Sequence, residues 1–132
     1  MPALNYKAEF AEAVENGTKR STIRPQRKNP IKPGDILYQY TGQRTKNSRK
    51  LGEHICTSVE PIEIEIDVDR GLNTIRVNGR TLTYREQHAL AQEDGFEGVI
   101  SFYKFFVRQY GLSPNNPLSD MVLIKWAPEA IS

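Results

Sequence analysis

The chain is organised around Gly17-Thr18-Lys19-Arg20-Ser21-Thr22-Ile23-Arg24, followed closely by Lys32-Pro33-Gly34-Asp35. Residues 17–24 bring together an amine, hydroxyl groups and two guanidinium groups. Hydroxyls and amines are the groups that proteins activate as nucleophiles, and guanidinium groups bind carboxylates, phosphates and oxyanions. The segment lies between a predicted helix and the first predicted strand after it. We therefore expect the functional site to be built around this segment.

Positive charge is concentrated in the first third of the chain. Between residues 19 and 50 the ten lysines and arginines are interrupted by one acid, Asp35, although the whole chain carries a formal charge of only +2. A basic surface favours anionic partners, of which phosphate backbones are the commonest. The residues expected to contact a nucleic acid are Arg27, Lys28, Arg44, Lys46, Arg49 and Lys50. For residues 41–50, a solvated loop is the alternative interpretation.

Size and composition bound the class of protein. A chain of 132 residues fits one domain, and no apolar run approaches the roughly 20 residues of a membrane span. No secretory signal is visible at the N-terminus, so a cytoplasmic location is expected. The single cysteine, Cys56, excludes an internal disulfide, and His54 and His88 stand far apart. We therefore expect no metal and no cofactor.

The first half of the chain predicts one helix and several strands. Apolar residues at helical spacing, ended by Asn16-Gly17, predict an amphipathic helix over residues 5–16. Short strands are predicted at 22–24 and 36–40. The alternating stretch 53–68 predicts two strands or one bent strand, because Pro61 requires a break, a bulge or an edge position.

The second half combines a hairpin with two helices. Asn78-Gly79 between β-forming runs is the strongest hairpin signal of the chain. Thr83 and Glu86 have the spacing of a capping box that opens a helix ending at Gly95, and an aromatic stripe predicts a second helix over 98–110. A final strand is predicted at 121–126. This order predicts an α+β fold, a small and mostly antiparallel β-barrel with an N-terminal helix and a late helix pair packed on it.

Several of these segments resemble one known family. Gly17-x-Lys19-x-x-x-x-Arg24 after a helix and Lys32-Pro33-Gly34-Asp35 before a strand resemble the ASCH domain, a β-barrel related to the PUA RNA-binding fold. The segments Ala91-Gln92-Glu93-Asp94-Gly95-Phe96 and Leu123-Ile124-Lys125-Trp126 are also similar to that family, especially to its short members in bacteria and phages. The resemblance implies a single ASCH/PUA-like domain over residues 1–132.

The resemblance also implies an activity. Some small ASCH proteins are amidohydrolases that remove the acetyl group of N(4)-acetylcytidine with a lysine, a threonine and a glutamate. By similarity these residues are Lys19, Thr22 and Glu93, and Arg24 matches the arginine of the motif. Other members are ribonucleases or RNA-binding modules, so the fold alone does not decide the function. The implied partner is a nucleoside or single-stranded RNA.

The chemistry of the residues agrees with the amidohydrolase interpretation. Thr22 needs a base to become a nucleophile, and Lys19 can be that base only when it is neutral. The nearby cations Arg20 and Arg24 and burial would lower the pKa of Lys19, whereas a carboxylate at Glu93 would raise it. Arg24 could bind an oxyanion, a base oxygen or a phosphate. Ser21 is the alternative nucleophile, and Arg20, Ser21 and Arg24 are the expected substrate-binding residues. A non-catalytic RNA-binding module, a ribonuclease and a protein-interaction domain remain alternative functions.

Overall fold

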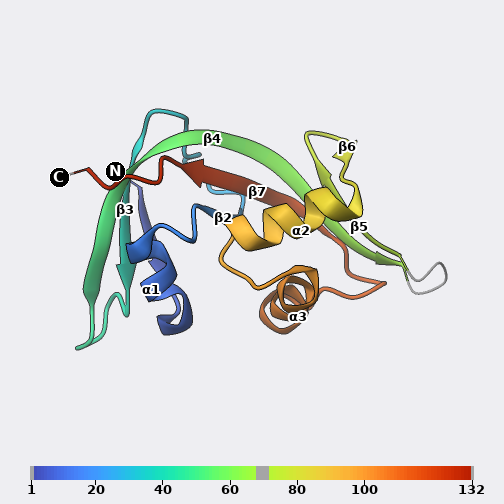
Figure 1. Cartoon of the computed structure of the whole chain (residues 1–132), viewed down its shortest axis with the longest axis horizontal. Helices are drawn as coiled ribbons and strands as arrows, with labels where there is room; N and C mark the ends of the chain where they lie inside the picture. Colours follow the sequence, from blue (N-terminus) through green and yellow to red (C-terminus); the bar gives the residue numbers. More distant parts are fainter. Residues whose placement is uncertain (1, 68–71, 132) are drawn as a thin grey trace.

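The structure, a computed structural model, describes residues 2–67 and 72–131. It is an α+β fold in which strands and helices are mixed along the chain (Figure 1). The elements are β1 (Ala3–Tyr6), α1 (Ala8–Asn16), β2 (Ser21–Pro25), β3 (Ile36–Thr41), β4 (Arg49–Asp67), β5 (Leu72–Val77), β6 (Arg80–Thr81), α2 (Tyr84–Glu93), α3 (Val99–Tyr110) and β7 (Leu118–Trp126). Figure 1 shows β4 arching over the molecule, with the three helices on the concave side of the arch.

The sheet is organised by β4, which is long enough to pair with three other strands. β3 pairs with its first part, β7 with its middle and β5 with its last part, all antiparallel. β2 adds to the outer edge of β7 antiparallel, whereas β1 adds to β3 in parallel. The mostly antiparallel sheet predicted from the sequence is therefore confirmed.

The predicted barrel is wrong, because the sheet does not close. Within the described residues β1 pairs only with β3, and β2 pairs only with β7. Between these two strands a side chain takes the place of a backbone ladder, since the Arg24 guanidinium donates from Nη2 to the carbonyl oxygen of Asn5 at 2.8 Å. The open edge between β1 and β2 leaves room for a cavity.

Two apolar cores fill the concave side of the sheet. The larger one joins α2 and α3 to β2, β4, β5 and β7, with Phe102 and Phe106 of α3 fully buried. The second joins β1 and α1 to β3, the first half of β4 and the end of β7, around Leu37 and Trp126. Most of the aromatic stripe of α3 is thus core, as helical spacing predicted.

One local expectation needs correction and another is confirmed in one of its alternatives. Residues 5 and 6, the start of the predicted helix, instead belong to strand β1, whose parallel pairing with β3 ends at Tyr6, and α1 begins only at Ala8. The predicted alternative of one bent strand around Pro61 is confirmed, since β4 is continuous and its ladder with β7 shifts register nearby, between Ile62 and Ile64. Of the two alternatives, one curved strand is therefore present rather than two separate strands. Val68, the predicted end of this strand, lies outside the described residues.

The local signals of the second half are confirmed. Asn78 and Gly79 both have positive φ, at 54° and 77°, as a two-residue hairpin turn requires. Thr83 and Glu86 form a reciprocal capping box at the start of α2. Gly111, in the left-handed conformation, ends α3. Strand β7 extends the predicted 121–126 segment back to Leu118.

Candidate functional site

Lys19 is fixed by contacts to the ends of two helices. Its backbone N–H donates to the carbonyl of Ala13 in the last turn of α1, at 2.9 Å. The next residue, Arg20, donates its N–H to the carbonyl of Glu93 at the end of α2, at 2.8 Å. β2 then begins at Ser21. Because both helix ends hold this turn, the side chain of Lys19 extends inward, where only 3% of the residue is exposed.

The amine of Lys19 meets Asp94, the residue that follows α2. Nζ donates to the Asp94 carbonyl oxygen at 2.6 Å and lies 3.1 Å from the carboxylate Oδ1. The hydroxyl of Ser21 donates to the same Oδ1 at 3.1 Å. Asp94 is itself buried, with 2% exposed. Lys19 and Asp94 therefore form a buried pair, and the hydroxyl of Ser21 hydrogen-bonds to its carboxylate.

The surroundings of Lys19 and Asp94 shift both pKa values in the direction that disfavours the charged forms. Burial lowers the pKa of Lys19 below its usual value, against the opposing attraction of Asp94, and Arg24 lowers it further. Burial raises the pKa of Asp94, against the effects of Lys19, Ser21 and Arg24. Both directions have the same physical origin, since a low-dielectric interior disfavours any isolated charge. The sequence suggested opposing influences on the pKa of Lys19, and burial is the largest of them.

Asp94, rather than the predicted Glu93, is the acid that contacts Lys19. Glu93 is the last residue of α2, and its carboxylate lies 3.6 Å from the amine of Lys125 on β7, on a partly exposed surface. Consecutive residues at a helix end point about 100° apart, so only one of two adjacent acids can face the interior. Here the inward one is Asp94. The sequence signal that identified the region, two acids before Gly95, did not distinguish between them.

Thr22 and Arg24 share one face of β2, as the alternation of a strand predicts. The Nε of Arg24 donates to the hydroxyl oxygen of Thr22 at 2.9 Å. The Arg24 guanidinium also lies over the ring of Tyr6, 4.9 Å from its centre. Thr22 is 4% exposed. These contacts hold a hydroxyl beside a cation, an arrangement suited to stabilising negative charge that develops at or near that hydroxyl.

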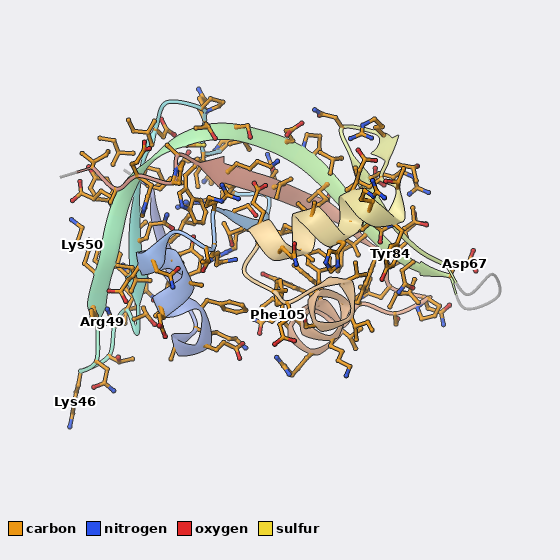
Figure 2. All side chains as sticks on the ribbon, viewed as in Figure 1. Lys46, Arg49, Lys50, Asp67, Tyr84 and Phe105 are labelled. Atoms are coloured by element: carbon orange, nitrogen blue, oxygen red, sulfur yellow. The ribbon has the colours of Figure 1, made fainter. Side chains whose placement is uncertain are left out.

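A cavity of about 100 Å³ lies between the two cores and collects these groups. Lys19, Thr22, Arg24 and Asp94 line it, and Ser21 does not. Aromatic rings form much of the remaining wall, and they come from β1, α1, the loop after α2, and α3: Tyr6, Phe10, Phe96, Phe105, Phe106 and Tyr110. Figure 2 shows Phe105 projecting from α3 toward α1, where its ring meets that of Phe10 at 5.3 Å edge to face.

These rings also contact the amine. Nζ of Lys19 lies 5.1 Å from the centre of the Phe10 ring and 5.8 Å from that of Tyr6. None of the rings was assigned to the site from the sequence, because the aromatic stripe of α3 was interpreted as core and Tyr6 was predicted to lie in a helix. The aromatic wall of the cavity forms only where α1 and α3 pack close to one another.

The other predicted site residues lie elsewhere. The side chain of Arg20 is exposed and does not line the cavity. Arg49 and Lys50 begin β4, where they pair with the carboxylates of Glu15 and Glu53. Figure 2 shows Lys46, Arg49 and Lys50 at the β3–β4 hairpin, away from Phe105, and none of the three lines the cavity. Arg27, Lys28 and Arg44 are exposed on loops outside the cavity as well.

Comparison of the chain with models of known families, with curated proteins and with solved structures finds no match. The ASCH assignment therefore stays a prediction that depends on the residues quoted above. Among residues 2–67 and 72–131, no group of three or more His, Cys, Asp or Glu side chains could hold a metal ion. In the same part of the chain, no helix is long and apolar enough to cross a membrane.

Gly95 provides a test of how closely Lys19 is held. Its φ is +95°, and a Cβ there would lie 3.2–3.3 Å from the Cβ, Cγ and Cδ atoms of Lys19. Gly79 in the hairpin turn has a similar φ of +77° but open space around it. We expect Gly95→Ala and Gly79→Ala each to lose about 1–2 kcal/mol of stability from backbone strain, measured by urea unfolding. Only Gly95→Ala should also weaken ligand binding or turnover, because it alone displaces Lys19. Equal function in both variants would contradict this placement.

Proposed function

We propose that the cavity binds a nucleobase acylated on its exocyclic amine and hydrolyses that amide, as in N(4)-acetylcytidine. One observation carries the proposal. A lysine whose pKa is lowered by burial shares a small aromatic cavity with a threonine hydroxyl, a carboxyl group and a guanidinium. Amide hydrolysis needs a nucleophile, a base near neutrality and a stabiliser of the oxyanion, and these residues supply all three.

Each residue has a distinct role in this reaction. Thr22 Oγ attacks the acyl carbonyl carbon, and its proton passes to the neutral amine of Lys19. The Arg24 guanidinium stabilises the oxyanion of the tetrahedral intermediate. The C–N bond then breaks as the Lys19 ammonium returns the proton to the leaving exocyclic nitrogen. Water hydrolyses the resulting Thr22 ester, which releases the carboxylic acid and restores the hydroxyl. Asp94 holds the lysine amine in position through these steps.

The walls of the cavity favour a flat aromatic ligand. Phe10, Phe96 and Phe105 contact one another edge to face or tilted, with ring centres 5.3–5.5 Å apart, and form a continuous apolar surface beside the polar groups. Base rings stack on or against such surfaces with little dependence on sequence. A small acyl group fits the size of the cavity better than a long one.

The RNA-binding alternative depends on a different surface. It requires the six basic residues of the loops and of the β3–β4 hairpin, two of which are already paired with carboxylates. Exposed pairs of this kind are weak and do not abolish RNA binding, but they reduce the charge available to a phosphate backbone. The groups in the cavity therefore favour amide hydrolysis over RNA binding by the six basic residues.

The direct test is incubation of the purified protein with N(4)-acetylcytidine, followed by chromatography for cytidine and acetate. N(4)-methylcytidine, which has no amide bond to cleave, is the matched ligand control. We expect turnover of the first and none of the second. Failure of the folded protein to release cytidine, together with binding to single-stranded RNA that weakens as salt rises, would replace the amidohydrolase by the RNA-binding module.

The pH dependence follows from the pKa of Lys19. Only the neutral amine accepts the proton of Thr22, so kcat/KM should rise with pH and level off above the pKa of Lys19. Because burial lowers that pKa, the rise should be centred below the value of about 10.4 for a free lysine. The profile is measured with saturating and limiting substrate across neutral and alkaline pH. A midpoint at or above the free value would contradict the role of Lys19 as the base.

A further inference from the structure

A buried chain of polar side chains runs from the cavity into the second core. The hydroxyl of Tyr6 on β1 donates to Oε1 of Gln39 on β3, and Nε2 of Gln39 lies 3.1 Å from Nδ1 of His54 on β4. The three residues are 3%, 0% and 2% exposed. Polar groups buried this deeply are costly unless each is paired in a defined way. Nothing in the reaction above uses Gln39 or His54.

The chain of hydrogen bonds has a fixed direction. An amide offers an oxygen that accepts and a nitrogen that donates, so Gln39 cannot accept from Tyr6 without turning its NH₂ group to His54. His54 must then present a lone pair at Nδ1, which means that it is neutral and carries its proton on Nε2. Burial lowers the pKa of His54, in agreement with a neutral ring.

The direction of this chain matters at Thr22. The Thr22 oxygen has two lone pairs, and one of them accepts from Nε of Arg24. The proton of Tyr6 points to Gln39, so the Tyr6 oxygen presents lone pairs rather than a proton on its cavity side, toward Thr22 and Arg24. If the proton of Tyr6 turned toward Thr22 instead, both lone pairs of the Thr22 oxygen would be occupied. No lone pair would then remain for attack on a carbonyl carbon.

We propose that Tyr6, Gln39 and His54 form a positioning chain that keeps the Tyr6 proton away from Thr22 and so preserves the nucleophilic lone pair. This inference rests on the proposed function, since it assigns Thr22 as the nucleophile. It adds two residues, Gln39 and His54, that touch neither the cavity nor a ligand and act only through Tyr6. Their contribution is the orientation of a proton rather than a contact with substrate.

Two variants of Gln39 separate this role from simple packing. Gln39→Met keeps the length of the side chain but cannot accept the Tyr6 proton. Gln39→Glu, protonated in this buried position, accepts from Tyr6 and donates to Nδ1 of His54, so it reproduces both bonds. Both variants are first compared with the parent by thermal unfolding.

The activity readout is acylation of Thr22 by p-nitrophenyl acetate. The rate is measured from the nitrophenolate that is released, and peptide mass analysis identifies the acylated residue. Removal of the outer hydrogen-bond partners of metal ligands costs about 10- to 100-fold in affinity or activity, and by analogy we expect a loss of this size for Gln39→Met. The rate for Gln39→Glu should stay close to that of the parent. Equal rates for Gln39→Met and the parent would overturn the inference, as would no acylation of Thr22 in the parent.

A second readout requires no substrate. Nitrogen NMR of the histidine rings reports which ring nitrogen of His54 carries the proton, and we expect the proton on Nε2 in the parent. A proton on Nδ1 would overturn the inference whatever the kinetics. Thr22 acylation that depends on Gln39, without cleavage of N(4)-acetylcytidine, would support the positioning chain while refuting the proposed substrate, so the two failures are distinguishable.

Discussion

Lys19→Met should abolish amide hydrolysis and destabilise the protein by about 3–5 kcal/mol near neutral pH. Methionine fills the space of the lysine stem but leaves the Asp94 carboxyl buried without the amine 3.1 Å away. Removing one member of a buried pair is more costly than its contacts suggest, because the other member loses both its partner and water. Urea unfolding at fixed pH measures the loss of stability, and the hydrolysis assay measures the loss of turnover.

The stability effect of Lys19→Met should depend on pH in a defined direction. Burial raises the folded-state pKa of Asp94 above its unfolded value, and the loss of Lys19 removes an influence that lowers it. The folded variant therefore binds a proton more readily than the unfolded chain, and its destabilisation should shrink as pH falls through that raised pKa. Lys125→Met is the matched control. It breaks the partly exposed pair with Glu93, at a cost of less than about 1 kcal/mol. Similar costs for the two lysines would contradict the buried pair.

Thr22→Val should reduce kcat by about 10³-fold or more, a loss of the order seen when a nucleophile is removed from an enzyme. Valine has nearly the shape of threonine and suits the centre of β2, where Thr22 pairs with Ile124. The fold should therefore survive, with a cost of about 1 kcal/mol for the bond from Arg24 that is lost. Thr22→Ser, which restores a hydroxyl, should recover much of the activity.

Ser21→Ala distinguishes the two candidate nucleophiles. Ser21 donates to Asp94 and lies outside the cavity wall, so its loss should weaken the support of Asp94 without removing the attacking group. A smaller reduction of kcat than in Thr22→Val is expected. If Ser21→Ala eliminated turnover while Thr22→Val preserved it, the roles of the two hydroxyls would be reversed.

Local signals in the sequence determined most of the elements. The Asn78-Gly79 turn, the Thr83–Glu86 capping box and the glycines after each helix act over a few residues, and each formed as expected. The closure of the sheet was predicted wrongly because it depends on which distant strands meet. Residues 5 and 6 were likewise assigned to a helix, because the parallel pairing of β1 with β3 is a contact between segments more than 30 residues apart.

The site was partly predictable for the same reason. Lys19, Thr22 and Arg24 belong to one short segment, and the alternation along a strand already placed Thr22 and Arg24 on one face. The choice between Glu93 and Asp94 required the angle at which α2 ends, which no local pattern revealed. Tyr6, Phe10 and Phe105 come from three separate elements, and only their packing turns them into the wall of one cavity.

The most direct test of the account compares hydrolysis of N(4)-acetylcytidine by the parent, Asp94→Asn and Glu93→Gln. The substitutions are chemically matched and adjacent in sequence, but only Asp94 contacts Lys19. We predict turnover by the parent, a loss of about 10²-fold or more in Asp94→Asn, and near-parental turnover in Glu93→Gln. Turnover that survives Asp94→Asn and disappears in Glu93→Gln would contradict the buried Lys19–Asp94 pair as the centre of the site, and absence of turnover in the parent would contradict the proposed reaction itself.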